Sequence, residues 1–177
     1  MKFGGGTRNL SPCPCKILER KGEQWALGKQ LLFDGNFEFY FDLKTLVNDQ
    51  QALYDQLKEE LRNSKGWHSK SLFVRLIEEE NDIVEILEYA RRKPEVIENY
   101  AEMLATNYKS DVIVIYSHFI KSEAGSSSNR KAYQRVCAIL NRYKEYAGKQ
   151  LQQELVTELM TLYKNRPAFL DELSKVK

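Results

Sequence analysis

Cysteine, histidine and long apolar runs are scarce in this chain of 177 residues. Its three cysteines are an odd number without regular spacing, which excludes the disulfide framework of a small secreted domain. The two histidines, His68 and His118, belong to no recognisable catalytic motif. No segment approaches the roughly 18 apolar residues that span a bilayer, and the stretch "MKFGGGTRNLSPCPC" lacks the apolar core of a signal peptide. We therefore expect a cytoplasmic chain with no membrane partner.

An excess of one charge is also missing, as are the common motifs for binding nucleotides or presenting a nucleophilic serine. The 27 lysines and arginines nearly balance the 25 aspartates and glutamates, and this net charge of +2 argues against a dedicated nucleic-acid binder. No G-x-x-x-x-G-K-[ST], G-x-G-x-x-G or G-x-S-x-G stretch occurs. The triple glycine near the N-terminus lacks the preceding strand that a phosphate-binding loop requires. The sequence therefore predicts a globular protein that is not an enzyme and needs no cofactor.

What the chain does have is a helical spacing of apolar residues that begins at Ile17 and continues to the C-terminus. Between Asp49 and Gly66, for example, leucines recur every four residues, and Gly66 is placed to end that helix. Residues 112–116 (VIVIY) alone would pass for a strand, but their helical continuation favours a helix. The pattern therefore predicts about ten helices. They are expected in residues 24–33, 37–47, 49–66, 69–81, 82–94, 95–108, 110–124, 130–148, 149–167 and 168–177.

The domain organisation follows from this pattern. Residues 1–16 hold three glycines and two prolines, and we expect an irregular leader there. Residues 17–177 are expected to form a single helical-repeat domain. Because short breaks make successive helices antiparallel, the expected all-α fold is a stack of helical hairpins arranged as an α-solenoid, a right-handed superhelix of the tetratricopeptide type. A closed helical bundle is the alternative.

Four segments carry a resemblance to a known family. They are "DGNFEFYFDLKTLV", "LKEELRNSKGWHSKSLFVRLIEEEN", "SSSNRKAYQRVCAIL" and "LYKNRPAFLDELSKV". From about Leu32 to Val176 the chain resembles the helical region that follows the zinc module in bacterial SWIM zinc-finger proteins. That resemblance implies a tetratricopeptide-type helical array, which serves as a scaffold more than as a catalyst.

The zinc module of that family has the pattern C-x-C, a variable spacer and then C-x-H. Cys13-Pro14-Cys15 matches the first half, but Cys137 is followed by Ala138 and Ile139, so the second half is absent. A structural zinc site needs four ligands, and two thiolates are not enough. We therefore predict no metal site, although two chains that pooled their Cys-x-Cys pairs could build one from four thiolates.

The candidate binding site is the helix over residues 129–147, where basic and aromatic residues alternate. Such residues can hold phosphates and stack on bases, or anchor a protein partner. The alternative is a helix whose tyrosines pack inward and whose basic face is simply solvated. The residues predicted to bind are Arg130, Lys131, Arg135, Arg142, Tyr143 and Tyr146.

Other candidate groups have simpler interpretations. Cys137 lies among apolar neighbours and is expected in the core. His118 is expected to be a half-buried packing residue. The carboxylates at residues 78–82 match no metal-binding loop and are expected in a solvated turn.

Two functions remain open at this point. The first is a non-catalytic scaffold that holds a protein or peptide in a concave groove, and its oligomeric state is unknown. The second is a nucleic-acid-associated accessory module that uses the helix 129–147. The salt dependence of binding separates them, because only phosphate-driven binding weakens steeply with added salt.

Overall fold

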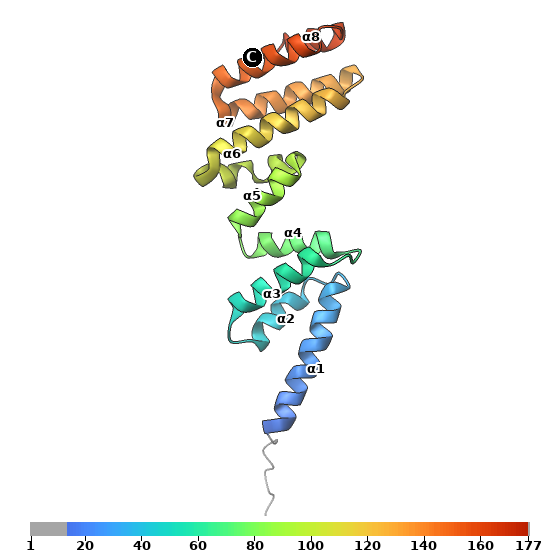
Figure 1. The fold of residues 1–177 in the computed structure, drawn as a ribbon, viewed down its shortest axis with the longest axis vertical. Coiled ribbons are helices and arrows are strands. Elements are labelled where there is room, and N and C mark those ends of the chain that lie inside the picture. The colour runs from blue at the N-terminus through green and yellow to red at the C-terminus, as the bar shows by residue number, and fades with distance from the viewer. Residues whose placement is uncertain (1–13, 177) are drawn as a thin grey trace, which may run out of the picture. The chain divides into compact units, whose positions relative to one another are not determined.

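The computed structural model describes residues 14–176, with side chains from Gly22 onward, and they form eight α-helices, one short 3₁₀-helix and no strand (Figure 1). The predicted all-α fold is confirmed, and the strand-like run at residues 112–116 lies within a helix. The described residues make two compact units that meet in sequence between Asp82 and Ile83. The stacking of the hairpins into a solenoid stays a prediction.

The first unit consists of two helical hairpins. Its helices are α1 (Pro14–Phe33), α2 (Phe39–Leu46), α3 (Gln50–Asn63) and α4 (Ser69–Glu79). α1 packs against α2, and α3 packs against α4. The apolar residues of α3 at the predicted spacing are all buried, at Leu53, Leu57 and Leu61. Because α1 begins at Pro14, the last residues of the predicted leader are helical, whereas residues 1–13 lie outside the described part.

Local signals set the ends of these helices. Asp49 caps α3, since its side chain accepts a hydrogen bond from the Ala52 amide at 2.9 Å. α1 ends in a turn at Gly35, whose φ of 108° suits glycine. A β-carbon at Gly35 would also lie 3.2 Å from the ring of His68, so the turn after α1 packs against the loop before α4. Gly66 lies beyond the end of α3 at Asn63 and does not cap it.

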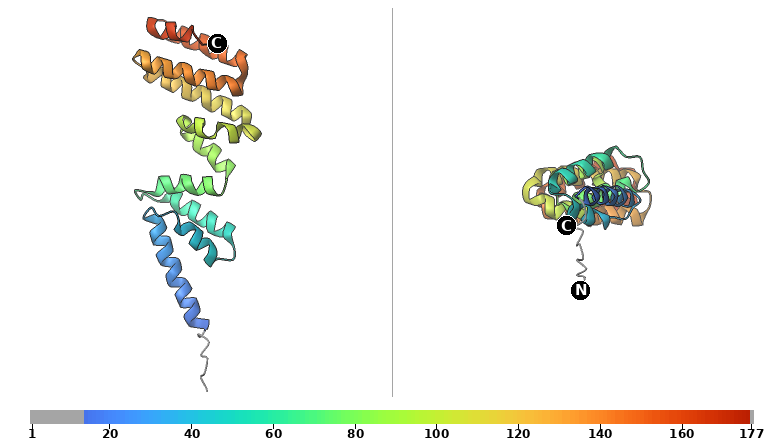
Figure 2. Two further views of the ribbon diagram at one scale, coloured as in Figure 1. Left: turned by 180° about the vertical axis from the view of Figure 1, so that it is seen from behind. Right: turned by 90° about the horizontal axis from the view of Figure 1, so that it is seen from below.

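The second unit is built mainly from two long helices. Its elements are α5 (Ile83–Arg92), η1 (Pro94–Val96), α6 (Ile97–Ser126), α7 (Arg130–Leu162) and α8 (Pro167–Leu173). α6 packs against α5 and α7, and α8 packs against the other long helix, α7 (Figures 1 and 2). Residues 17–177, for which we expect one domain, thus contribute to both units.

Each long helix contains one kink where the sequence predicts a break. Tyr108 leaves the helical conformation in α6, with φ −129° and ψ 39°. Gly148 does so in α7, with φ 82° and ψ 169°. The two predicted helices on either side of each kink therefore form one longer element. Asn129 caps the start of α7 by accepting a hydrogen bond from the Ala132 amide at 3.0 Å.

Candidate functional site

The arginines of the predicted site are bound to carboxylates of neighbouring helices. Arg130, at the start of α7, donates to Asp171 of α8 at 2.6 Å. Its Nε also lies 3.2 Å from Oε1 of Glu172, which is 6% exposed. Arg130 therefore connects α7 to α8, while its side chain stays 59% exposed.

The other two arginines connect α7 to α6. Arg135 places its Nε 3.4 Å from a carboxylate oxygen of Glu123, and Arg142 donates to Glu98. The two arginines are seven residues apart, so they lie on the same side of α7, which is the side that meets α6. Each of these arginines thus has a carboxylate partner within the unit, although their side chains are 65% and 46% exposed.

The tyrosines of the same helix point into the protein. Tyr143 is 3% exposed, and half-buried Tyr146 stacks on Tyr116 of α6 with ring centroids 5.7 Å apart. Burial raises the pKa of Tyr116 to about 12. Lys131 is exposed at the start of the helix. The six predicted residues therefore do not form one surface. The three arginines pair with carboxylates of neighbouring helices, the two tyrosines pack inward, and Lys131 is exposed.

The carboxylates at residues 78–82 are not simply solvated, because one of them accepts two hydrogen bonds. Oε1 of Glu80 accepts from the Tyr40 hydroxyl and from Lys44 Nζ, both at 2.7 Å. Burial alone would raise the pKa of the Glu80 carboxyl, but these bonds and the Lys44 charge outweigh burial and hold the pKa below its ordinary value. The pKa of the Tyr40 hydroxyl is raised, mainly by burial and next by its hydrogen bond to the Glu80 carboxylate.

The next helix repeats this arrangement with a second carboxylate. Asp82 accepts from the Tyr54 hydroxyl at 2.5 Å and from Lys58 Nζ at 3.1 Å. In both helices a lysine follows a tyrosine by four residues and lies over its ring, at 4.5 Å from the ring centroid for Tyr54. The Y-x-x-x-K spacing is visible in the sequence, and sequence reasoning missed it. These contacts fix the end of α4 to α2 and α3.

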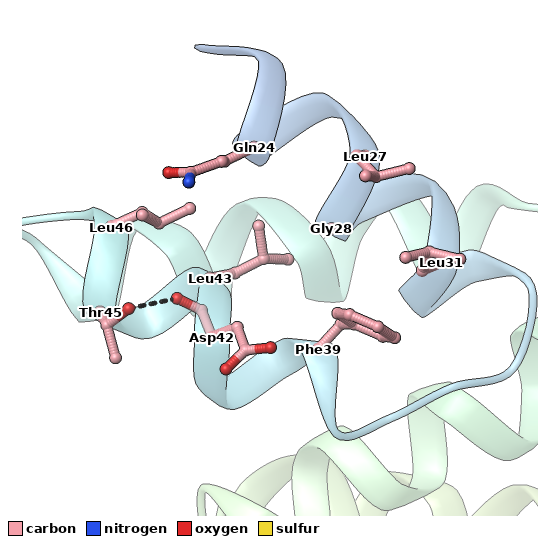
Figure 3. Close-up of a pocket in the computed structure, with 9 residues that line it drawn as sticks. All are labelled: Gln24, Leu27, Gly28, Leu31, Phe39, Asp42, Leu43, Thr45 and Leu46. Carbon is pink, nitrogen blue, oxygen red and sulfur yellow. Dashed lines mark hydrogen bonds between the residues drawn. The ribbon is translucent and has the colours of Figure 1, made fainter. Parts of the chain in front are cut away.

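An apolar groove that no other described residue covers lies between α1 and α2 in the first unit. The two helices approach closely at Gly28, where a β-carbon would lie 3.2 Å from a methyl group of Leu43. Beside this contact the helices diverge and leave a volume of about 340 Å³ (Figure 3). Its lining is mostly apolar and consists of Gln24, Leu27, Gly28, Leu31, Phe39, Asp42, Leu43, Thr45 and Leu46.

The groove exposes apolar surface and one carboxylate. Leu27 is 58% exposed, although its position in the helical pattern predicts an inward side chain. Leu43 at the base of the groove is fully buried, and Phe39 and Leu31 line the end nearest the turn (Figure 3). Asp42 is the only titratable residue of the lining, and it forms no ion pair with any described residue. The groove therefore offers an apolar surface beside one carboxylate.

Groups with potential chemistry elsewhere have ordinary surroundings. Cys137, which we expect in the core, is only half-buried, because it lies on the side of α7 toward the C-terminal residues Glu172 and Lys175. Burial still raises the pKa of its free thiol to about 11, so the thiol is protonated at neutral pH. His118 is exposed on α6, contrary to the half-buried position that we expect for it. Across the described residues, no three metal-ligating side chains are gathered in one place. Cys13 and the side chain of Cys15 lie outside the described part.

Two further results complete the description. Within residues 14–176 no helix has both the length and the apolar composition to cross a membrane. Comparison with known protein families, with curated proteins and with solved structures finds no match to this chain. The resemblance to the helical region of SWIM zinc-finger proteins stays a prediction.

Proposed function

We propose that this chain is a non-catalytic, cytoplasmic helical scaffold that binds another protein through the groove between α1 and α2. The observation that carries the proposal is the uncovered apolar surface of that groove, in particular Leu27 at 58% exposure. Exposed apolar clusters with a polar rim are typical of protein-interaction sites. The solenoid expected from the sequence, and the resemblance to a helical array, support the same class of function.

The chemistry of the groove favours a protein side chain over a small polar metabolite. Its volume of about 340 Å³ is near the lower end of the range of about 300–1,000 Å³ for ligand pockets, so it suits one large side chain. Only three lining residues, Gln24, Asp42 and Thr45, carry polar side chains. Such a surface provides an apolar anchor point with few directional hydrogen bonds, which is how hot spots of protein interfaces are built.

A peptide selection with a matched control tests this proposal. A displayed library of random peptides is selected on the wild-type chain, and the selected peptides are then measured against Leu27→Glu and Leu162→Glu. Leu162 is a suitable control because it is 64% exposed on α7, so both changes place a carboxylate at an exposed leucine.

We expect peptides with a large apolar residue that lose at least about tenfold in affinity for Leu27→Glu and bind Leu162→Glu like the wild type. Circular dichroism checks that both variants fold. A selection that yields no wild-type binder, or binders indifferent to Leu27→Glu, would contradict the proposal.

A further inference from the structure

The loop between α3 and α4 exposes Trp67 to solvent, and hydrogen bonds restrain the backbone of this loop. The Gly66 amide donates to Ser64 Oγ at 3.1 Å, and the Ser69 hydroxyl donates to the same oxygen at 2.7 Å. Ser69 is only 3% exposed, and a β-carbon at Gly66 would lie 2.7 Å from its hydroxyl. These contacts leave Trp67 at 93% exposure. The backbone of the loop is therefore restrained, and a tryptophan has only two side-chain torsions to fix on binding.

The charges around Trp67 complement those of the groove. Lys65 and Lys70 flank the tryptophan, both are exposed, and neither forms an ion pair with a described residue. Asp42 on the groove is also exposed and also without an ion pair there. The first unit therefore carries an apolar knob with free cations and an apolar groove with a free carboxylate. We name residues 65–70 the Trp67 loop.

We propose that the Trp67 loop of one chain inserts into the α1–α2 groove of a second copy of this chain. The indole then occupies the apolar surface at Leu27 and Phe39, and Lys65 and Lys70 approach Asp42. This inference rests on the proposed function of the groove and names its partner. Since the knob and the groove are different surfaces, the contact either forms twice in a two-fold dimer or continues as a chain of copies.

Other classes of partner fit the Trp67 loop less well. Proteins that bind single-stranded nucleic acids stack successive bases on several aromatic side chains, and this loop offers one. Binding of the loop to an anionic membrane would gain about 1 kcal/mol for each lysine near the lipid. Such binding would leave the groove and Asp42 unused. A second copy uses the tryptophan, both lysines, the groove and its carboxylate together.

The first measurement is sedimentation of the full chain over a concentration series from about 1 µM to about 1 mM. We expect the average mass to rise with concentration. In a Trp25→Phe background, where Trp67 is the only tryptophan, its emission should shift to shorter wavelength over the same range. Trp67→Ala should weaken association at least about 30-fold, as expected for a hot-spot residue, whereas the control Leu162→Ala should not.

The second measurement mixes two variants that should not associate alone. Trp67→Ala retains the groove, and Leu27→Glu retains the Trp67 loop, so each should be monomeric, while the equimolar mixture should form a one-to-one complex. Circular dichroism shows whether each variant is folded. A chain that stays monomeric throughout, an association that survives both variants, or a mixture of folded variants that stays monomeric would overturn the inference. Blue-shifted Trp67 emission only with anionic vesicles or with oligonucleotides would overturn it as well.

The two proposals fail separately. A chain that stays monomeric but still selects peptides dependent on Leu27 contradicts self-association and leaves the protein-binding groove in place. A selection without any groove-dependent peptide, measured at concentrations too low for self-association, contradicts the proposed function itself.

Discussion

Replacing Glu80 by alanine should destabilise the first unit by about 1–4 kcal/mol. The Tyr40 hydroxyl is fully buried and donates to Glu80 at 2.7 Å, so its loss of an acceptor costs about 1–3 kcal/mol. The ion pair of Glu80 with Lys44, whose two side chains are 24% and 23% exposed, adds up to about 1 kcal/mol. Glu79→Ala is the matched control, because Glu79 is the adjacent exposed glutamate of α4 and should change stability by less than about 0.5 kcal/mol.

Urea unfolding measures both variants, with the midpoint expected to fall and the slope to stay constant. A cycle with Tyr40→Phe and the double variant should give a coupling of about 1 kcal/mol or more between Tyr40 and Glu80. A loss below 0.5 kcal/mol for Glu80→Ala, or a coupling near zero, would refute the reasoning that this contact fixes α4 to α2.

The same contact has a pH dependence of known sign. Since the folded chain holds the pKa of Glu80 below its ordinary value of 4.5, the ionised carboxylate contributes stability above that pH. This contribution should be lost as the pH falls from the ordinary value through the lower pKa of the folded state. The stability difference between the wild type and Glu80→Gln should therefore shrink in acid. A difference that is constant between neutral pH and acid would contradict this assignment.

Three further predictions concern other positions. Gly148→Ala should destabilise the second unit by about 1–3 kcal/mol in urea unfolding, because φ of 82° with ψ of 169° is strained for alanine, and an unchanged midpoint would count against the kink. With Cys13 and Cys15 replaced by serine, Cys137 should react with iodoacetamide at least about tenfold more slowly in the folded chain than in urea, since its pKa is raised to about 11; equal rates would contradict its burial. Metal analysis of the purified chain should find no stoichiometric zinc, because the second pair of zinc ligands is absent. A content near one zinc per chain would contradict this prediction.

Helix positions were predictable because the signals for them are local. The recurrence of Leu53, Leu57 and Leu61 lies within one helix, and the structure confirms that all three are buried. Residues 112–116 resemble a strand only when they are read without the following turns of α6. Spacing along the chain is sufficient for such elements, since each is formed by contacts between near neighbours.

The candidate site was not predictable, because it depends on contacts between distant residues. The sequence shows Arg142 on a basic helix but does not show Glu98 opposite it, 44 positions earlier. Leu27 has the spacing of a core residue, yet α2 meets α1 at Gly28 and leaves Leu27 uncovered. Which apolar residue stays exposed is decided by how two helices approach each other, and the sequence pattern does not contain that information.

Hydrogen exchange of the full chain, with and without a selected peptide, tests the central claim most directly. If the groove is the binding site, the peptide should slow exchange in residues 24–31 of α1 and 39–46 of α2, which line the groove. The same peptide should leave residues 130–146 of α7 unchanged. Slower exchange confined to α7 would place binding on the basic helix and contradict the account.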